Sequence, residues 1–154
     1  MNNRKLITKI ILYSYIYDNK NCTDINFIKN LMLFYKTVSR QSPEIILNKK
    51  NEIVGFKSTL LNKNLDLFLY KLINFTIPKI KKDLIFDSKN FIFDNNYNAY
   101  LLLHNKKYFF EYRTIASLDF NCTFNIQLIF NKYADNLEKL NYIKNILNIK
   151  FNKK

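Results

Sequence analysis

Residues 120–130 read Phe-Asn-Cys-Thr-Phe-Asn-Ile-Gln-Leu-Ile-Phe, and this stretch decides the fold that we expect. Every even-numbered residue from Phe120 to Phe130 is apolar, while the odd-numbered residues 121–127 are polar. Successive side chains of a strand point to opposite faces of a sheet, so this alternation predicts a strand with one buried and one wet face. Half-buried strands of this kind are typical of antiparallel sheets.

Other segments supply further strands. Alternation from Leu6 to Tyr17 predicts a first strand whose tyrosine face could stack on bases or simply cover a partly exposed sheet. Short strands are expected at Ile45–Leu47 and Ile53–Phe56 around the polar turn 48–51, and residues 58–61 read as a continuation of the extended chain. Ala99–Leu103 and Tyr108–Tyr112 predict a hairpin, whereas residues 79–98 read as irregular and polar.

Three helices complete the pattern. One is predicted from about Asp24 to Val38 with Thr23 or Asp24 as its cap, and a second from about Asn64 to Phe75, ending where Pro78 disfavours helix at Ile77. A third starts near Asp135, whose spacing to Glu138 is that of a capping box. The apolar stripes expected to be buried are Ile28, Leu31, Met32, Tyr35, Val38; Leu65, Phe68, Leu69, Leu72, Ile73; and Leu137, Leu140, Ile143, Leu147. Without strict β-α alternation, these elements predict an α+β fold over residues 1–154, one domain with helices packed on one face of an antiparallel sheet.

Charge indicates the class of partner. Twenty-five basic and 12 acidic residues give a formal charge of +13. Codon bias toward A and T can explain part of the lysine excess, but not the shortage of acidic residues, whose codons are also rich in A and T. A polyanionic partner is therefore expected: nucleic acid first, and an anionic membrane surface as the alternative.

The sequence offers little for catalysis or metal binding. Cys22 and Cys122 are isolated, which favours two buried thiols in a reducing compartment, and His104 is the only histidine. The acidic residues are scattered, and no glycine-rich phosphate loop or nucleophile elbow occurs. We expect no enzyme activity, no metal and no cofactor. No apolar run is long enough for a membrane span.

Basic residues and the only glycine gather in the middle of the chain. Arg40-Gln41, Lys49-Lys50, Lys57 and Lys63 follow one another through the middle strands and turns, and Lys79, Lys81 and Lys82 follow the second helix. They are read either as phosphate contacts or as ordinary solvated lysines. Gly55 is expected where a side chain would collide, because only glycine permits such a close backbone approach, or else it is a chance survivor of the composition.

These middle residues resemble the family of large-subunit ribosomal protein five. Arg40-Gln41-Ser42-Pro43 and Val54-Gly55-Phe56-Lys57 are similar to the family's Gly-Gln-Lys-Pro and Ala-Gly-Phe-Lys, which a basic turn also separates. Further similar segments follow in the family's order over most of the chain. They are Ser58-Thr59-Leu60, residues 72–80 around Pro78, Asn96-Tyr97-Asn98, Leu118-Asp119-Phe120 and Ile149-Lys150-Phe151.

The resemblance implies a component of the large ribosomal subunit, in the central protuberance, that binds rRNA among neighbouring ribosomal proteins. It also implies a bridge to small-subunit protein thirteen. Carried over by position and by charge, the rRNA-binding residues would be Arg40, Gln41, Lys49, Lys50, Gly55, Lys57, Thr59 and Lys79.

The chain departs from the family pattern in three places. The family carries a loop of about ten residues that reaches toward tRNA, whereas here Lys57 leads straight to Ser58, so the tRNA contact does not carry over. Leu12-Tyr13-Ser14-Tyr15 stands where the family has Leu-Asn-Met-Gly, and a tyrosine cannot reproduce the amide that contacts 5S rRNA. The family's amino-terminal helix is missing as well. Together with the codon bias and the lack of an import signal, these losses suggest a protein encoded in the organelle and working in the mitochondrial matrix, on a ribosome with reduced rRNA.

Overall fold

The strand with alternating residues lies inside a six-stranded sheet. The computed structural model describes residues 6–16, 24–83, 91–93, 98–118 and 122–145. Within these, β6 (Phe124–Phe130) buries its even-numbered side chains and leaves the odd-numbered ones half-exposed. The predicted alternation is thus confirmed from Phe124 onward, and residues 119–121 lie outside the described part.

All strands pair antiparallel, in the order β2-β3-β1-β6-β5-β4. Their bounds are β1 Ile7–Tyr15, β2 Glu44–Leu47, β3 Ile53–Leu60, β4 Phe91–Phe93 and β5 Ala99–Leu103. β1 is central, because β3 pairs with one of its edges and β6 with the other. The first predicted strand is confirmed, and β3 runs on through residues 58–60 as the extended pattern indicated.

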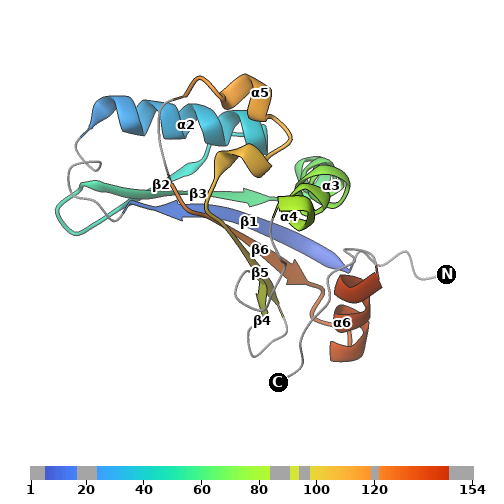
Figure 1. The fold of residues 1–154 in the computed structure, drawn as a ribbon. Coiled ribbons are helices and arrows are strands. Elements are labelled where there is room, and N and C mark those ends of the chain that lie inside the picture. Colours follow the sequence, from blue (N-terminus) through green and yellow to red (C-terminus); the bar gives the residue numbers. More distant parts are fainter. Residues whose placement is uncertain (1–5, 17–23, 84–90, 94–97, 119–121, 146–154) are drawn as a thin grey trace.

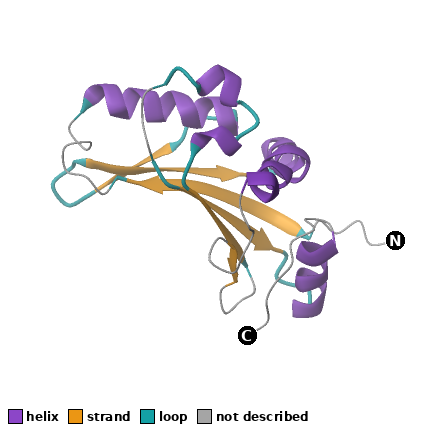
Figure 2. Cartoon of the chain, in the orientation of Figure 1, coloured by secondary structure: helices purple, strands orange, loops and turns teal. Residues whose placement is uncertain are grey.

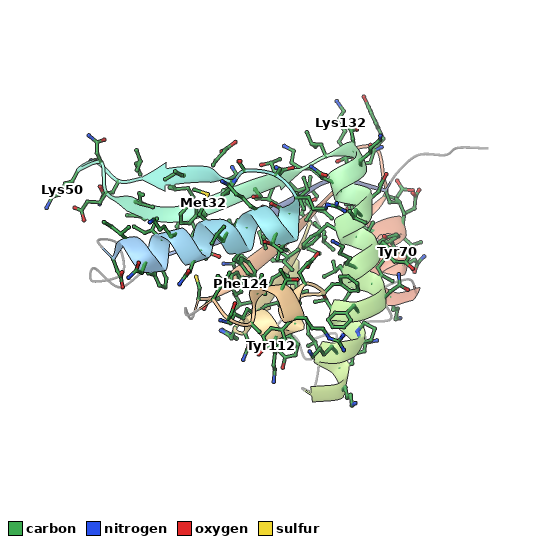
Figure 3. All side chains as sticks on the ribbon, turned by 90° about the horizontal axis from the view of Figure 1, so that it is seen from above. Met32, Lys50, Tyr70, Tyr112, Phe124 and Lys132 are labelled. Carbon is green, nitrogen blue, oxygen red and sulfur yellow. The ribbon has the colours of Figure 1, made fainter. Side chains whose placement is uncertain are left out.

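The helices form a layer on one face of this sheet (Figures 1 and 2). That layer contains α2 (Ile25–Ser39), α3 (Asn62–Lys71), a π-helix (Leu72–Thr76), α4 (Ile77–Asp83) and α5 (Tyr112–Ile115). Seen from above, α2 and α3 run in different directions (Figure 3), and α6 (Asn136–Asn145) lies beyond the end of β6 (Figure 1). The α+β fold with helices packed on an antiparallel sheet is confirmed.

Three packed aromatic rings join the helix layer to the sheet. Phe34 of α2 stacks on Phe124 of β6 with ring centroids 4.5 Å apart. Phe109 stands edge-on to both rings, at 5.0 and 5.2 Å. All three side chains are buried, so each adds a large apolar area to the core in addition to its ring contacts.

Polar groups are also buried between α2 and the sheet, and they are paired. Tyr35 lays its ring on Phe56 of β3 and shares a 2.6 Å hydrogen bond between its hydroxyl and Ser14 Oγ of β1. Ser39 Oγ donates to the Tyr35 carbonyl, and Ser58 Oγ donates to Ser39 Oγ. These bonds satisfy hydroxyls that would otherwise cost free energy when buried.

The helix cap of α2 and the buried stripe of α3 agree with the sequence predictions, whereas the buried stripe of α2 is rotated. Asp24 caps α2 as predicted, since its Oδ1 accepts from the backbone N–H of Asn26 at 3.0 Å. In α2 the most buried apolar residues include Phe27 and Phe34, while Ile28 and Met32 are only partly buried. The predicted inner stripe of α3 and the π-helix is confirmed: Leu65, Phe68 and Leu72 are buried, and Leu69 and Ile73 pack against the core.

The predicted break before Pro78 is wrong, because the helix continues through it. The π-helix makes this possible: the Ile77 N–H donates to the Leu72 carbonyl, five residues back instead of four. α4 then begins at Ile77, so Pro78 lies in a first turn, where a missing N–H costs least. Within the segment 79–98, which was expected to be irregular, residues 79–83 complete α4 and residues 91–93 form β4, while residues 84–90 and 94–97 lie outside the described part.

The predicted strand at Tyr108–Tyr112 is also wrong. A 3₁₀ turn (Lys106–Tyr108) and α5 occupy this segment, and β5 pairs with β4 and β6 instead. Asn105 starts the turn by accepting from the Lys107 N–H at 2.9 Å. Tyr108 and Phe109 are both buried, which a strand with one wet face does not allow.

α6 buries a face rotated from the predicted one: Ile143 is buried as predicted, but the predicted Leu137 is not. Leu137 is 68% exposed, whereas Ile143 is fully buried and Lys139 is only 7% exposed. Leu140 is half-buried and Leu147 lies outside the described residues. Tyr142 explains the rotation, because its ring packs edge-on against Phe130 at the end of β6, with centroids 6.0 Å apart.

Alkaline titration should reveal the burial of Tyr35. Burial raises the pKa of Tyr35 well above its ordinary value, so the folded chain keeps it neutral where the unfolded chain ionises it. Its contribution to stability is therefore complete below the unfolded pKa of about 10, and is lost as pH rises from there through the folded pKa.

Tyr35→Phe should lower the free energy of unfolding by about 1 kcal/mol at neutral pH, because the buried hydrogen bond between Ser14 Oγ and the Tyr35 hydroxyl is lost. That difference from wild type should shrink above pH ~10. Urea denaturation of both proteins at several pH values measures it, and a difference that stays constant with pH would contradict this account.

Candidate nucleic-acid interface

The face of the sheet opposite the helix layer carries tyrosine, lysine and amide side chains. Since Ser14, Phe56 and Leu128 are buried beneath the helices, their odd-numbered neighbours on β1, β3 and β6 point the other way. We call this surface the open face. Its residues are Ile11, Tyr13 and Tyr15 of β1; Gly55, Lys57 and Thr59 of β3; and Asn125, Gln127 and Ile129 of β6.

Strand register arranges the open face in rows. In one row, Tyr13 lies between Lys57 and Asn125, and Glu44 of β2 ends the row beyond Lys57. Tyr15 is 42% exposed, and its ring meets the Tyr13 ring edge-on at 5.7 Å. The result is a cation beside two aromatic rings.

The neighbouring row holds a fixed amide. Ile11 lies between Thr59 and Gln127, and Gln127 pairs in turn with Tyr100 of β5. Gln127 Nε2 donates to Tyr100 Oη at 2.7 Å. Sequence reasoning did not single out Asn125, Gln127 or Tyr100 as binding residues, although the alternation that exposes Asn125 and Gln127 was visible.

Gly55 occupies the tightest place on this face. It pairs with Tyr15 on one side and Ile46 on the other. A Cβ added there would lie 2.5 Å from the Ser14 carbonyl oxygen and 3.3 Å from Cδ1 of Tyr15. Gly55 has no positive φ, so close approach alone requires glycine here, and the prediction of a collision site is confirmed.

The two lysines of the basic turn lie at the far end of the β2–β3 hairpin. Asn48 holds that turn, because its Oδ1 accepts from the Lys50 and Glu52 N–H groups at 2.9 and 3.0 Å. Asn51 adopts a left-handed conformation with φ of 61°. Lys49 and Lys50 are exposed there, and Figure 3 shows Lys50 at the tip.

The side-chain amide of Gln41 is hydrogen-bonded within the protein at both its nitrogen and its oxygen. Its Nε2 donates to the Thr59 carbonyl at 3.0 Å, and its Oε1 accepts from Asn64 Nδ2 at 2.9 Å. It therefore ties β3 to the start of α3. Arg40, next to it, is exposed and ends α2 in a left-handed conformation with φ of 58°.

Lys79 is separated from the other predicted site residues. It lies on α4, in the helix layer, where its Nζ donates to the Lys107 carbonyl at 2.8 Å. Its ammonium group also lies over the rings of Phe75 and Tyr112, at 5.3 and 5.5 Å from their centroids. The fold thus brings Gly55, Lys57 and Thr59 onto one face and leaves Lys79 in another layer.

The described residues offer little reactive chemistry. Across those residues, no three His, Cys, Asp or Glu side chains gather as metal ligands would. Burial raises the pKa of Cys122, which keeps its thiol protonated and poorly nucleophilic. No helix within the described ranges is long and apolar enough to cross a membrane.

No protein-family model matches this sequence, and a search of curated proteins finds no match.

The contact at Gly55 can be tested by adding one methyl group. Gly55→Ala should lower the free energy of unfolding by about 1–3 kcal/mol, since the Cβ collides with the Ser14 backbone, which cannot rotate away. Chemical denaturation measures the loss. Thr59→Ala, on the same face of the same strand, is the control and should cost clearly less; equal stability of Gly55→Ala and wild type would disprove the close approach.

Proposed function

We propose that this chain is a structural, non-catalytic component of the large ribosomal subunit of a mitochondrial ribosome. It binds rRNA through the open face and the tip of the β2–β3 hairpin. The place in the central protuberance and the bridge to small-subunit protein thirteen belong to this proposal through the sequence resemblance alone.

The row around Tyr13 is the observation that carries the proposal. Lys57 supplies a cation for phosphate, Tyr13 and Tyr15 supply flat rings, and Asn125 supplies an amide that can donate and accept. A sheet face that presents rings and cations together is a recurring platform for RNA bases and phosphates. The opposite face cannot serve in this way, because α2 and its neighbours cover it (Figure 2).

Charge supports the same partner. Lys49 and Lys50 extend the cationic surface beyond the sheet, on an exposed turn that their neighbour Asn48 holds in shape. The net charge of +13 favours association with a polyanion and disfavours self-association. A phosphate backbone contacted by such lysines releases counterions, so binding must weaken as salt rises.

The uninterrupted course of β3 argues against a tRNA contact. β3 is unbroken from Ile53 to Leu60, so Lys57 and Ser58 are consecutive residues of one strand. The tRNA-reaching loop of the resembled family would interrupt the strand at this point. We therefore propose rRNA docking without a tRNA contact.

Salt dependence tests this mechanism. A variant with Lys49, Lys50 and Lys57 changed to alanine should bind large-subunit rRNA more weakly. Its slope of log affinity against log salt should be smaller in magnitude by about 0.9 for each phosphate that the variant no longer neutralises, or about 2.7 if all three lysines touch phosphates. Filter binding across a salt series gives both quantities.

A control variant removes the same charge elsewhere. Lys29 and Lys36 are exposed on α2 and Lys144 on α6, and their joint replacement by alanine should change the slope much less. Equal slopes for the two triple variants would mean that charge acts without a defined face. Flotation with anionic vesicles but no binding to rRNA would favour the membrane alternative.

A further inference from the structure

A second cluster of rings and cations lies in the helix layer, where α5 meets α3, the π-helix and α4. Lys71, Phe75 and Lys79 follow one another at intervals of four residues along these helices. Facing them are Phe110 and Tyr112, from the start of α5. We call these five residues the aromatic ladder.

Ring–ring and cation–ring contacts connect the members of the aromatic ladder. Lys71 Nζ lies 5.6 Å from the Phe110 centroid, and the Phe110 and Phe75 rings meet edge-on at 5.5 Å. Lys79 Nζ then lies over Phe75 and Tyr112. Cation–π contacts of this kind are favourable within about 6 Å.

Ionic and polar contacts hold the ladder rigid. Lys71 forms a largely buried salt bridge with Glu111, next to Phe110 in the chain. Lys79 donates to the Lys107 carbonyl at 2.8 Å. The Glu111 carboxylate is thus occupied by Lys71, and this salt bridge fixes the chain directly beside Phe110.

Phe110 is unusually exposed for a ring in such a fixed setting. It is 55% exposed, whereas Phe109 beside it is buried. Arg113, three residues further on, is exposed as well. A preorganised ring binds a flat partner at low entropic cost. Lys71, Lys79 and Arg113 together carry more positive charge than Glu111 offsets, which favours an anionic partner.

We propose that the aromatic ladder is a second RNA site, at which an unpaired nucleotide stacks its base on Phe110 while Arg113 contacts a neighbouring phosphate. This inference rests on the proposed RNA-binding function for the choice of partner, but it uses another layer of the fold. The open face and the ladder would then hold two separate parts of the RNA. A single-stranded segment fits best, because only an unpaired base exposes its ring to stacking.

Single-stranded RNA tests the ladder directly. The probe is a 12-nucleotide oligouridylate with one central 2-aminopurine, whose fluorescence is quenched by stacking; the neighbouring uridines stack only weakly, so the free probe is bright. Phe110→Ala should weaken binding roughly 5- to 100-fold, the range that loss of one base–aromatic stack produces, and should abolish the quenching. Phe110→Tyr keeps the ring and should retain both.

Two further variants keep the test decisive. Tyr70→Ala removes a ring of similar exposure, 65%, from the side of α3 away from Tyr112, and should bind like wild type (Figure 3). Phe110→Leu preserves apolar packing against Phe75, so it should fold yet lose the quenching. If Phe110→Leu quenches like wild type, or if Tyr70→Ala weakens binding as much as Phe110→Ala, the ladder site is refuted.

Variants of the open face distinguish failure of the ladder site from failure of the proposed function. Lys57→Ala should weaken binding to large-subunit rRNA. It should leave the quenching of the 2-aminopurine probe unchanged. If all Phe110 variants bind rRNA normally and the wild type does not bind the 2-aminopurine probe, the ladder site is refuted and the proposed function stands. If every open-face variant still binds rRNA like wild type, the proposed function is refuted instead.

Discussion

The central position of β1 is the constraint on which the rest of the structure depends. β1 pairs with β3 and β6 at once, so its register decides which side chains of three strands share a face. A slip of one residue on either side would move Lys57 or Asn125 beneath the helices. Gly55 protects this register, because no other residue allows β3 to come so close to the Ser14 carbonyl.

The register of β1 also links the buried hydrogen bond of Ser14 to the position of the open-face side chains. Ser14 and Tyr13 are neighbours on β1, yet Ser14 bonds to Tyr35 beneath α2 while Tyr13 lies next to Lys57 on the other side. Fixing one therefore positions the other. The proposed RNA-binding surface lies on a central strand and needs no mobile loop, so its rings and cations are in place before a partner arrives.

Much of the sheet was predictable from sequence, because a two-residue period leaves a visible trace wherever one face is buried. Phe124 to Phe130 and the strand around Tyr13 show this. The segment at Tyr108 looked like a strand from its ring content, but two consecutive buried rings override that propensity. Pro78 indicated a break, yet the π-helix places it in a first turn, and no local pattern predicts such a change of register. The open face followed from alternation, whereas the alignment of Tyr13 with Lys57, and the separation of Lys79 from both, depend on tertiary pairing that the sequence does not display.

Ultraviolet crosslinking within isolated ribosomal subunits tests the central claim most directly. The tagged chain is expressed in its native compartment, subunits are separated on a sucrose gradient, irradiated and digested, and crosslinked peptides are identified by mass spectrometry. The account predicts that the chain sediments with the large subunit and carries rRNA crosslinks at Tyr13 or Tyr15 of β1 and at Lys57 of β3. Sedimentation away from the large subunit, or crosslinks in that subunit confined to residues outside the open face and the β2–β3 hairpin, would contradict it.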